Sequence, residues 1–440
     1  MDASELKSWY IDVFKDFEKY LNGEKLSPVH SLRRRAIEKF SELNFPDLHQ
    51  EEWRFTDVSP ILRHTFSPAR PGELRGLIKD KLSHFLFGGM QSHLVVFVNG
   101  FYDHRLSSIL DLPRGAFVGS LSKAFEEGRE SVLQNVSMCA DTGENSFTAL
   151  NTSFVQDGAF VSLPAGVVLE HPVHLLFIST GSDNLIVQPR NLVITGEDSQ
   201  LRFIEHYVSI GAGVYFTNAV TEINAGMNSV IDAVKVQSEN EAAYHVATTA
   251  VALSSGASFD CHNIALGASI YRHNLNVMLK GEGSNTNLEG LYLTKSQQLS
   301  DTHTMIDHSS PRCTSQEHFK GILDDKSRGV FNGKILVRKG AQQTNSYQEN
   351  RNIILSDEAK VDTKPQLEIF ADDVKCSHGA TVGQLSKESV FYLTSRGIGE
   401  EQAKLMLIYA FANDVLKNVK ESEVRSELEG ILSARILKGD

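Results

Sequence analysis

The sequence predicts a mainly β protein in which a β-solenoid lies between two helical regions. From about residue 150 to 375, short strand-like segments follow one another with almost no helical periodicity. On both sides of this stretch, apolar residues recur at the three- and four-residue spacing of amphipathic helices. A polar, amide-rich run at 342–350 lies between two strand-like segments. We therefore expect a helical N-terminal domain over 1–90, a mixed α/β region over 91–150, a solenoid core over 151–385 and a helical C-terminal domain over 386–440.

The N-terminal region is predicted to hold three helices. The first carries an apolar stripe made of Leu6, Trp9, Tyr10, Val13, Phe14 and Phe17. Ser27 and Pro28 suit the N-cap and first position of a second helix. A third candidate spans 73–87 and is followed by two glycines, which suit a helix C-terminus. The β-rich run 94–98 then marks a change of structure.

A run of short strands is compatible with a sandwich, a barrel or a solenoid. More than 200 residues is long for one sandwich, and Asn-Gly or Asp-Gly hairpin turns are nearly absent from the run. The amides of 342–350 can form hydrogen-bonded ladders between stacked coils, whereas a sandwich core could not satisfy them. A plain polar loop is the alternative for that segment. These points favour the solenoid, although no fixed period is visible.

The C-terminal region is predicted to contain two amphipathic helices. The apolar stripe of the first is Ala403, Leu407, Ala410, Phe411, Val415 and Val419. The second runs from 421 towards 437. A small helical domain at the end of a solenoid can cover the exposed last coil, and it can also dock a partner. We expect both roles here.

Composition narrows the class of function. The formal net charge is −12, which argues against nucleic acid as a partner because phosphate binding needs clustered Lys and Arg. We find neither a secretory signal nor an apolar run long enough for a transmembrane helix, so we expect no membrane partner. The four cysteines show no C-x-x-C spacing. We expect free thiols and a reducing cytoplasm.

The sequence lacks a convincing nucleotide site. Residues 329–334 superficially suggest a phosphate-binding loop, but the glycine spacing is one short and Ile335 replaces the Ser or Thr that would hold magnesium. Motifs of the G-x-S-x-G and H-E-x-x-H types are missing as well. We therefore expect a protein that is not an enzyme, and any ATP that its task requires to be handled by another subunit.

Cys376 and His378 form the best chemical candidate. They are two residues apart, so on an extended strand they point to the same side. A thiolate and an imidazole are both ligands for iron, and Asp372 and Asp373 just before them could accept hydrogen bonds or protons. Two ligands fall short of the four that a closed tetrahedral site needs. Either another chain, sulfide or solvent completes the site, or the pair is a core Cys beside a surface His.

A second cluster supports a rival hypothesis. Asp301, His303 and Asp307 share one face of a predicted strand and could bind a hard cation. The chain would then be a metal-dependent β-helix hydrolase or lyase. The alternative is a polar ladder on the surface of a sheet.

Several segments of the last third resemble the SufB/SufD family. They are SQEHFKGIL at 315–323, VFNGKI at 330–335, QQTN at 342–345, TKPQLEI at 363–369, DDVKCSHGAT at 372–381 and, further on, FYL and SRGI at 391–398. EEWRFTD at 51–57 resembles the N-terminal marker of the family. CSHGAT stands where the SufB paralogue carries a Glu-His-Glu-Ala type of sequence, so this chain lacks the acidic ligand of that paralogue.

The resemblance implies a right-handed parallel β-helix between helical domains. It implies a scaffold role in a complex with a SufB-like paralogue and two copies of the ABC-type ATPase SufC, in which iron–sulfur clusters are built de novo. His378, and after it Cys376, would hold a transient cluster at the interface with SufB, and no cluster would be bound stably by the isolated chain, which could form a homodimer. The ATPase would dock on the C-terminal helix, through Ala403, Leu407, Ala410, Phe411 and Val415. A purely structural partner of SufB is the alternative.

Overall fold

Strand-forming residues in the centre of the chain fold into two long sheets. The computed structural model describes residues 3–21, 28–70, 81–140, 142–143 and 145–438. The 11-stranded sheet contains β1 (Ser67–Pro68), β4 (Phe117–Ser120), β5 (Ala159–Leu163), β7 (Leu185–Val187), β8 (Arg190–Thr195), β10 (Tyr215–Ala225), β12 (Tyr244–Leu253), β14 (Ile270–Leu279), β16 (Leu299–His308), β18 (Arg328–Val337) and β20 (Lys360–Ile369). The 10-stranded sheet contains β2 (His93–Val98), β3 (Phe101–Tyr102), β6 (Val173–Ser179), β9 (Gln200–Ser209), β11 (Val230–Ser238), β13 (Ser258–Ala265), β15 (Asn285–Thr294), β17 (Thr314–Leu323), β19 (Thr344–Ile354) and β21 (Val374–Gly383).

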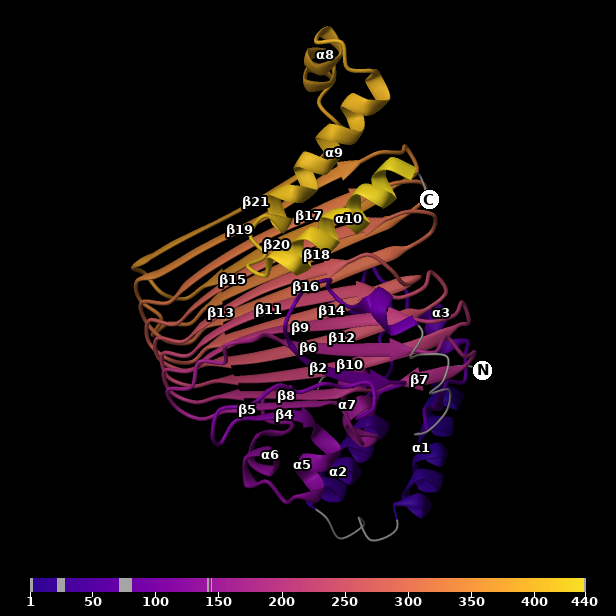
Figure 1. The fold of residues 1–440 in the computed structure, drawn as a ribbon, viewed down its shortest axis with the longest axis vertical. Coiled ribbons are helices and arrows are strands. Elements are labelled where there is room, and N and C mark those ends of the chain that lie inside the picture. The colour runs from indigo at the N-terminus through magenta and orange to yellow at the C-terminus, as the bar shows by residue number, and fades with distance from the viewer. Residues whose placement is uncertain (1–2, 22–27, 71–80, 141, 144, 439–440) are drawn as a thin grey trace.

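From β8 onwards, successive strands alternate between the two sheets, and neighbours within each sheet are parallel. The chain therefore winds into a parallel β-solenoid of about seven turns, and Figure 1 shows its strands stacked along the long axis. The predicted fold class is confirmed. Tyr244 pairs with Ile270 whereas Arg328 pairs with Lys360, so one coil takes 26 residues and another takes 32. This variation explains why the sequence shows no fixed period.

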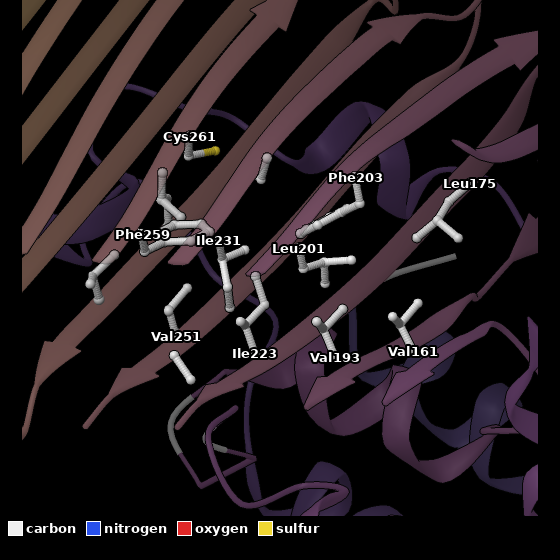
Figure 2. Close-up of a cluster of buried hydrophobic side chains, with 14 of the residues drawn as sticks. Val161, Leu175, Val193, Leu201, Phe203, Ile223, Ile231, Val251, Phe259 and Cys261 are labelled. Carbon is white, nitrogen blue, oxygen red and sulfur yellow. The ribbon is translucent and has the colours of Figure 1, made fainter. Parts of the chain in front are cut away.

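Alternating side chains fill the space between the two sheets. Val161, Val193, Ile223 and Val251 are register partners on four successive strands of the 11-stranded sheet, and Figure 2 shows them side by side. All four are buried, and full burial of one such side chain contributes about 1.5–3 kcal/mol. A register slip of one residue would turn a whole strand's apolar set outward, so this ladder fixes the register.

Helices cover the first coils. The N-terminal helices are α1 (Ala3–Tyr20), α2 (Pro28–Glu42), α3 (Ser59–Leu62), α5 (Leu121–Glu126), α6 (Glu130–Asn135) and α7 (Ser146–Ser153), with 3₁₀ turns at η2 (Glu51–Trp53) and η3 (Leu82–Phe85). The first two predicted helices are confirmed, and Leu6, Tyr10 and Phe14 of the predicted stripe are buried. The expected cap at Ser27 lies outside the described residues. So does most of the third predicted helix, of which the turn η3 is described.

The C-terminal helices are α8 (Lys387–Ser395), α9 (Glu400–Leu416) and α10 (Ser422–Lys438). Buried residues of α9 and α10 pack on the outer face of the 10-stranded sheet, against Val234, Ile264 and Ile322 among others. The expectation that these helices cover the last coil is wrong, because β20 and β21 hold no buried side chain among their described residues. Figure 1 shows α8 standing clear of the solenoid beyond its end. Among the described residues, no helix is both long enough and apolar enough to cross a membrane.

Candidate metal centre at the open end of the solenoid

Cys376 and His378 lie on β21, the last strand of the 10-stranded sheet. They share one face of the strand, as the sequence predicts. Their register partners on β19 are Ser346 and Gln348, both of which are buried between the sheets. The pair therefore continues two columns of inward-facing side chains. Since no further coil follows, Cys376 is half-buried and His378 is exposed at the open end.

The thiol of Cys376 borders a small apolar cluster that contains Ile335, Val337 and Ala371. Burial raises the pKa of this thiol, and a hydrogen bond from the backbone N–H of Ser346 acts in the opposite direction. Cys376 is therefore a neutral thiol near pH 7. It must lose a proton before it can bind a metal, because the thiolate is the ligand form.

The two acidic neighbours are not brought to the pair. Asp372 and Asp373 lie in the exposed turn that precedes β21. Asp373 is anchored through its backbone, whose N–H donates to Oε1 of Gln342 at 2.9 Å. Within the described residues, no hydrogen bond or ion pair joins either carboxylate to Cys376 or His378. The described part of the chain also contains no group of three or more potential ligands placed to hold a metal ion.

The column below Cys376 is a chain of hydroxyl groups. Ser346 and Ser315 are register partners, and their Oγ atoms lie 2.7 Å apart. Ser315 Oγ lies 2.9 Å from Nε2 of His308, which is fully buried. Burial lowers the pKa of His308 to about 4, against the opposing charge of Asp307. His308 is therefore neutral at physiological pH, and the polar groups beneath the thiol are hydrogen-bonded to one another.

The column below His378 contains an amide and a carboxyl group. Gln348 and Glu317 are register partners with fully buried side chains, and Nε2 of Gln348 donates to Glu317. Burial raises the pKa of Glu317 to about 7, although the neighbouring Thr304 hydroxyl and the Gln348 amide both lower it. The segment 344–354 is thus the strand β19, with the amides of Gln348, Asn350 and Asn352 buried inside the solenoid and that of Asn345 exposed. The interpretation of 342–350 as a plain polar loop is wrong for 344–350, whereas Gln342 and Gln343 lie in the turn before the strand.

The rival cluster does not form a metal site. Asp301, His303 and Asp307 do lie on one strand, β16. Asp301 is paired with Arg272, at 2.5 Å between Oδ2 and Nη1, and Asp307 is paired with Arg338 at 2.7 Å. Burial would raise the pKa of Asp301, but the Arg272 charge holds it well below its usual range. The two carboxylates are therefore committed to separate arginines.

The segment EEWRFTD instead attaches the N-terminal region to the 11-stranded sheet. The guanidinium of Arg272 lies 4.3 Å from the centroid of the Trp53 ring, and its Nη1 donates to the backbone oxygen of Glu52 at 3.0 Å. Glu52 Oε2 lies 3.1 Å from Nδ1 of His303, and Thr56 donates to Asp301. Sequence reasoning missed this contact because its two sides are more than 200 positions apart. The signal available in the sequence was an Arg at position 272 within a strand-like run.

The predicted docking stripe on α9 is mostly turned inward. Ala403 and Val415 are buried, Leu407 and Phe411 are half-buried, and Ala410 is exposed. The large apolar side chains that α8 and α9 expose are Phe391 (73%), Tyr392 (58%) and Met406 (44%). A partner would therefore meet these three side chains before it met the predicted stripe.

Comparison with known proteins covers almost the whole chain. Residues 4–175 match the SufBD protein N-terminal region, and residues 177–411 match the SUF system FeS cluster assembly, SufBD core domain. An iron–sulfur cluster assembly SufBD family protein of Synechocystis is 34% identical over 95% of this chain and 93% of its own length. The iron–sulfur cluster assembly protein SufD of Escherichia coli is 30% identical over 95% of each chain. Protein ABCI7, chloroplastic, of Arabidopsis thaliana is 30% identical over 91% of this chain and 84% of its own length.

Proposed function

Because the chain belongs to the SufBD family of iron–sulfur cluster assembly proteins, we propose that it is a non-enzymatic scaffold subunit that pairs with a SufB-like paralogue and a SufC-like ABC ATPase. In this proposal the cluster is cargo, held for a time at the interface between the two scaffold subunits. Four free cysteines are in keeping with a reducing cytoplasm as the place of work.

The observation that carries the proposal is the open last coil. Cys376 and His378 face the uncovered end of the solenoid, and they supply two ligands where a tetrahedral iron site needs four. The outer edge of β21 also leaves backbone N–H and C=O groups without a neighbouring strand. A partner that covered this edge would satisfy the backbone and bring the missing ligands in one step. A second copy of this chain would cover the edge when the paralogue is absent, giving a homodimer.

Replacing His378 with Ala in the purified three-protein complex tests the ligand role. We expect the yield of cluster, followed by its visible absorption, to fall severalfold, and we expect a smaller fall for Cys376→Ala because its neutral thiol is the poorer ligand. His104→Ala, which removes an exposed imidazole from a loop near the other end of the solenoid, is the matched control. An unchanged yield with His378→Ala would leave a purely structural partner as the correct reading.

The ATPase would bind the exposed apolar side chains at the C-terminal end. Phe391 and Tyr392 are large, solvent-exposed and close in sequence, which is typical of an interaction surface. We expect the double variant Phe391→Ser, Tyr392→Ser to lose co-purification with the ATPase while keeping the paralogue. Met138→Ser, which changes another exposed apolar residue, is the control. Retention of the ATPase by the double variant would place its docking surface elsewhere.

A further inference from the structure

The polar column inside the last three coils ends at His378. Glu317, Gln348 and His378 occupy the same register position on β17, β19 and β21. The two lower side chains are fully buried, and the third lies at the open end. Neighbouring strands are about 4.8 Å apart, so the end of the Gln348 side chain is within reach of the imidazole on the next strand.

The amide of Gln348 has a fixed direction. Its Nε2 donates to Glu317, which retains an accepting oxygen whether or not it is protonated. The space between the two sheets (the lumen) also fits this amide, because a Cβ at Gly333 would lie 2.1 Å from Nε2 of Gln348. Glycine at that position leaves the space that the amide needs.

The carbonyl group of the same amide has no partner. Oε1 of Gln348 is buried and accepts no hydrogen bond from any described residue. Buried polar atoms are nearly always satisfied, so a donor for this oxygen is expected. His378 does not make this bond in the structure, but it is the register partner of Gln348, and its exposed ring can turn towards the amide. A neutral imidazole carries one N–H to donate and one lone pair.

We propose that Gln348 is a positioning residue for His378, with Oε1 of the amide accepting one ring N–H so that the other ring nitrogen presents its lone pair to the open end. This inference rests on the proposed function, because it assumes that the free nitrogen serves as an iron ligand. A histidine that binds a metal commonly donates its second nitrogen to an oxygen acceptor, which fixes the tautomer and the orientation of the ring. Glu317 acts one step further back by fixing the amide.

The tautomer of His378 can be read directly by NMR of the full-length chain with nitrogen-15-labelled histidine. His378→Ala assigns the signals. We expect one tautomer in the natural chain and a mixture of two in Gln348→Met, which removes the acceptor at similar volume. Asn350→Leu is the matched control, since it removes an amide from the neighbouring inward position of β19, whose register partner is Ala380. In this control, the His378 signals should stay as in the natural chain.

A second variant covers the case in which Gln348→Met folds poorly. Glu317→Gln keeps the volume but offers both a donor and an acceptor, so the Gln348 amide can turn round and the single tautomer should again be lost. Identical His378 signals in the natural chain and in both variants would overturn the inference. So would an equal change in the Asn350→Leu control, because the effect would then be a general disturbance of the coil.

Binding of ferrous iron to the purified complex separates this inference from the proposed function. We expect Gln348→Met to weaken iron binding by roughly 10- to 100-fold, as loss of an orienting acceptor does at other metal sites. If His378→Ala abolishes cluster formation while Gln348→Met changes neither tautomer nor affinity, the positioning role alone is wrong. If Gln348→Met changes the tautomer while His378→Ala leaves cluster yield intact, the ligand role is wrong and the orientation stands.

Discussion

Two buried carboxyl groups of this protein, those of Glu317 and Asp301, have different kinds of neighbour. Glu317 is held by an amide in the lumen, and Asp301 is held by a guanidinium on the outer face of a sheet. The two carboxyl groups are both fully buried, but their pKa values move in opposite directions. A hydrogen bond from an amide offsets only part of the free energy that burial of a carboxylate costs, whereas a contacting arginine offsets more of it. Glu317 therefore predicts that stability depends on pH, and Asp301 predicts that stability depends on its arginine.

Stability should fall between pH 4.5 and 7 on account of Glu317. Its pKa is about 7 in the folded protein against an ordinary value of 4.5, so the folded state keeps a proton that the unfolded state has lost in this range. Proton binding by the folded state favours folding at low pH, and this contribution, of about 3 kcal/mol in full, disappears as pH rises to 7. Glu317→Gln should remove this dependence of the unfolding free energy on pH. Urea unfolding midpoints at pH 5 and pH 8 measure it, and an equal slope in both proteins would contradict the assignment.

Arg272 should be a critical residue of the N-terminal attachment. Arg272→Met leaves the buried carboxylate of Asp301 without its positive partner, which typically costs about 3–5 kcal/mol. It also removes the contact with the Trp53 ring. Lys326→Met breaks an ion pair with Glu358 that is well exposed on both sides and should cost under about 1 kcal/mol. Thermal unfolding compares the stability of the two variants. An equal loss of stability in both would show that the buried ion pair stabilises the protein no more than the exposed one.

At the scale of elements, the helix α9 shows why amphipathic faces are hard to assign from sequence. Leu407 and Phe411 belong to the predicted docking stripe and are half-buried, whereas Ile408 and Ala412, which lie outside that stripe, are buried together with Ala403 and Val415. Apolar residues run consecutively through this part of the helix, so several faces offer an apolar stripe. Contacts with distant strands of the sheet decide which face is buried, and no local pattern encodes them.

Packing on the sheet should hold α9 in place. Leu416 is 1% exposed among the residues that join α9 and α10 to the sheet, so Leu416→Ala should cost about 2–5 kcal/mol. Because Leu416→Ala weakens only the packing of α9 and α10 on the sheet, these helices should detach before the solenoid unfolds. Limited proteolysis with mass spectrometry would detect early cleavage in 397–421. Met406→Ala, on the exposed side of the same helix, should leave the cleavage rate unchanged.

At the scale of the whole molecule, the strands and the solenoid could be predicted, whereas the register could not. Short apolar runs are visible in the sequence, and a strand needs only such a run. Register requires knowing which residue of one coil lies over which residue of the next, and coil length varies between 26 and 32 residues. The pair Cys376 and His378 was found because it is local. Its contact with the polar columns below could not be found, since it depends on that register.

Two columns of inward-facing side chains also change character along the long axis. The column that ends at His378 includes Val173 and Phe203 in its apolar part, and the column that ends at Cys376 includes Ile231 and Phe259. Along these two columns, apolar packing holds the first coils and hydrogen bonds hold the last ones, whose end is left open. Stability in a stacked structure is close to a sum over neighbouring coils, so it should decline towards this end.

Hydrogen exchange should follow this decline. We expect the amides of β20 and β21 to exchange first and those of β10 to β13 to exchange last, because only the latter lie between covered coils. Addition of the SufB-like partner should slow exchange in β21 if that edge is its binding surface. Uniform exchange along the solenoid would contradict the expected decline in stability.

The stacking of coils also sets the distance between the two ends of this protein. Each coil lengthens the body by one strand spacing of about 4.8 Å and leaves the sequence of its neighbours untouched. The number of coils therefore sets how far the pair at the open end stands from the helices that cover the other end. A chain with one coil more or one coil fewer would present the same two side chains on the same strand, but it would hold them at a different height above its base. In this architecture, the distance of the pair from the covered end can therefore change independently of the side chains that form it.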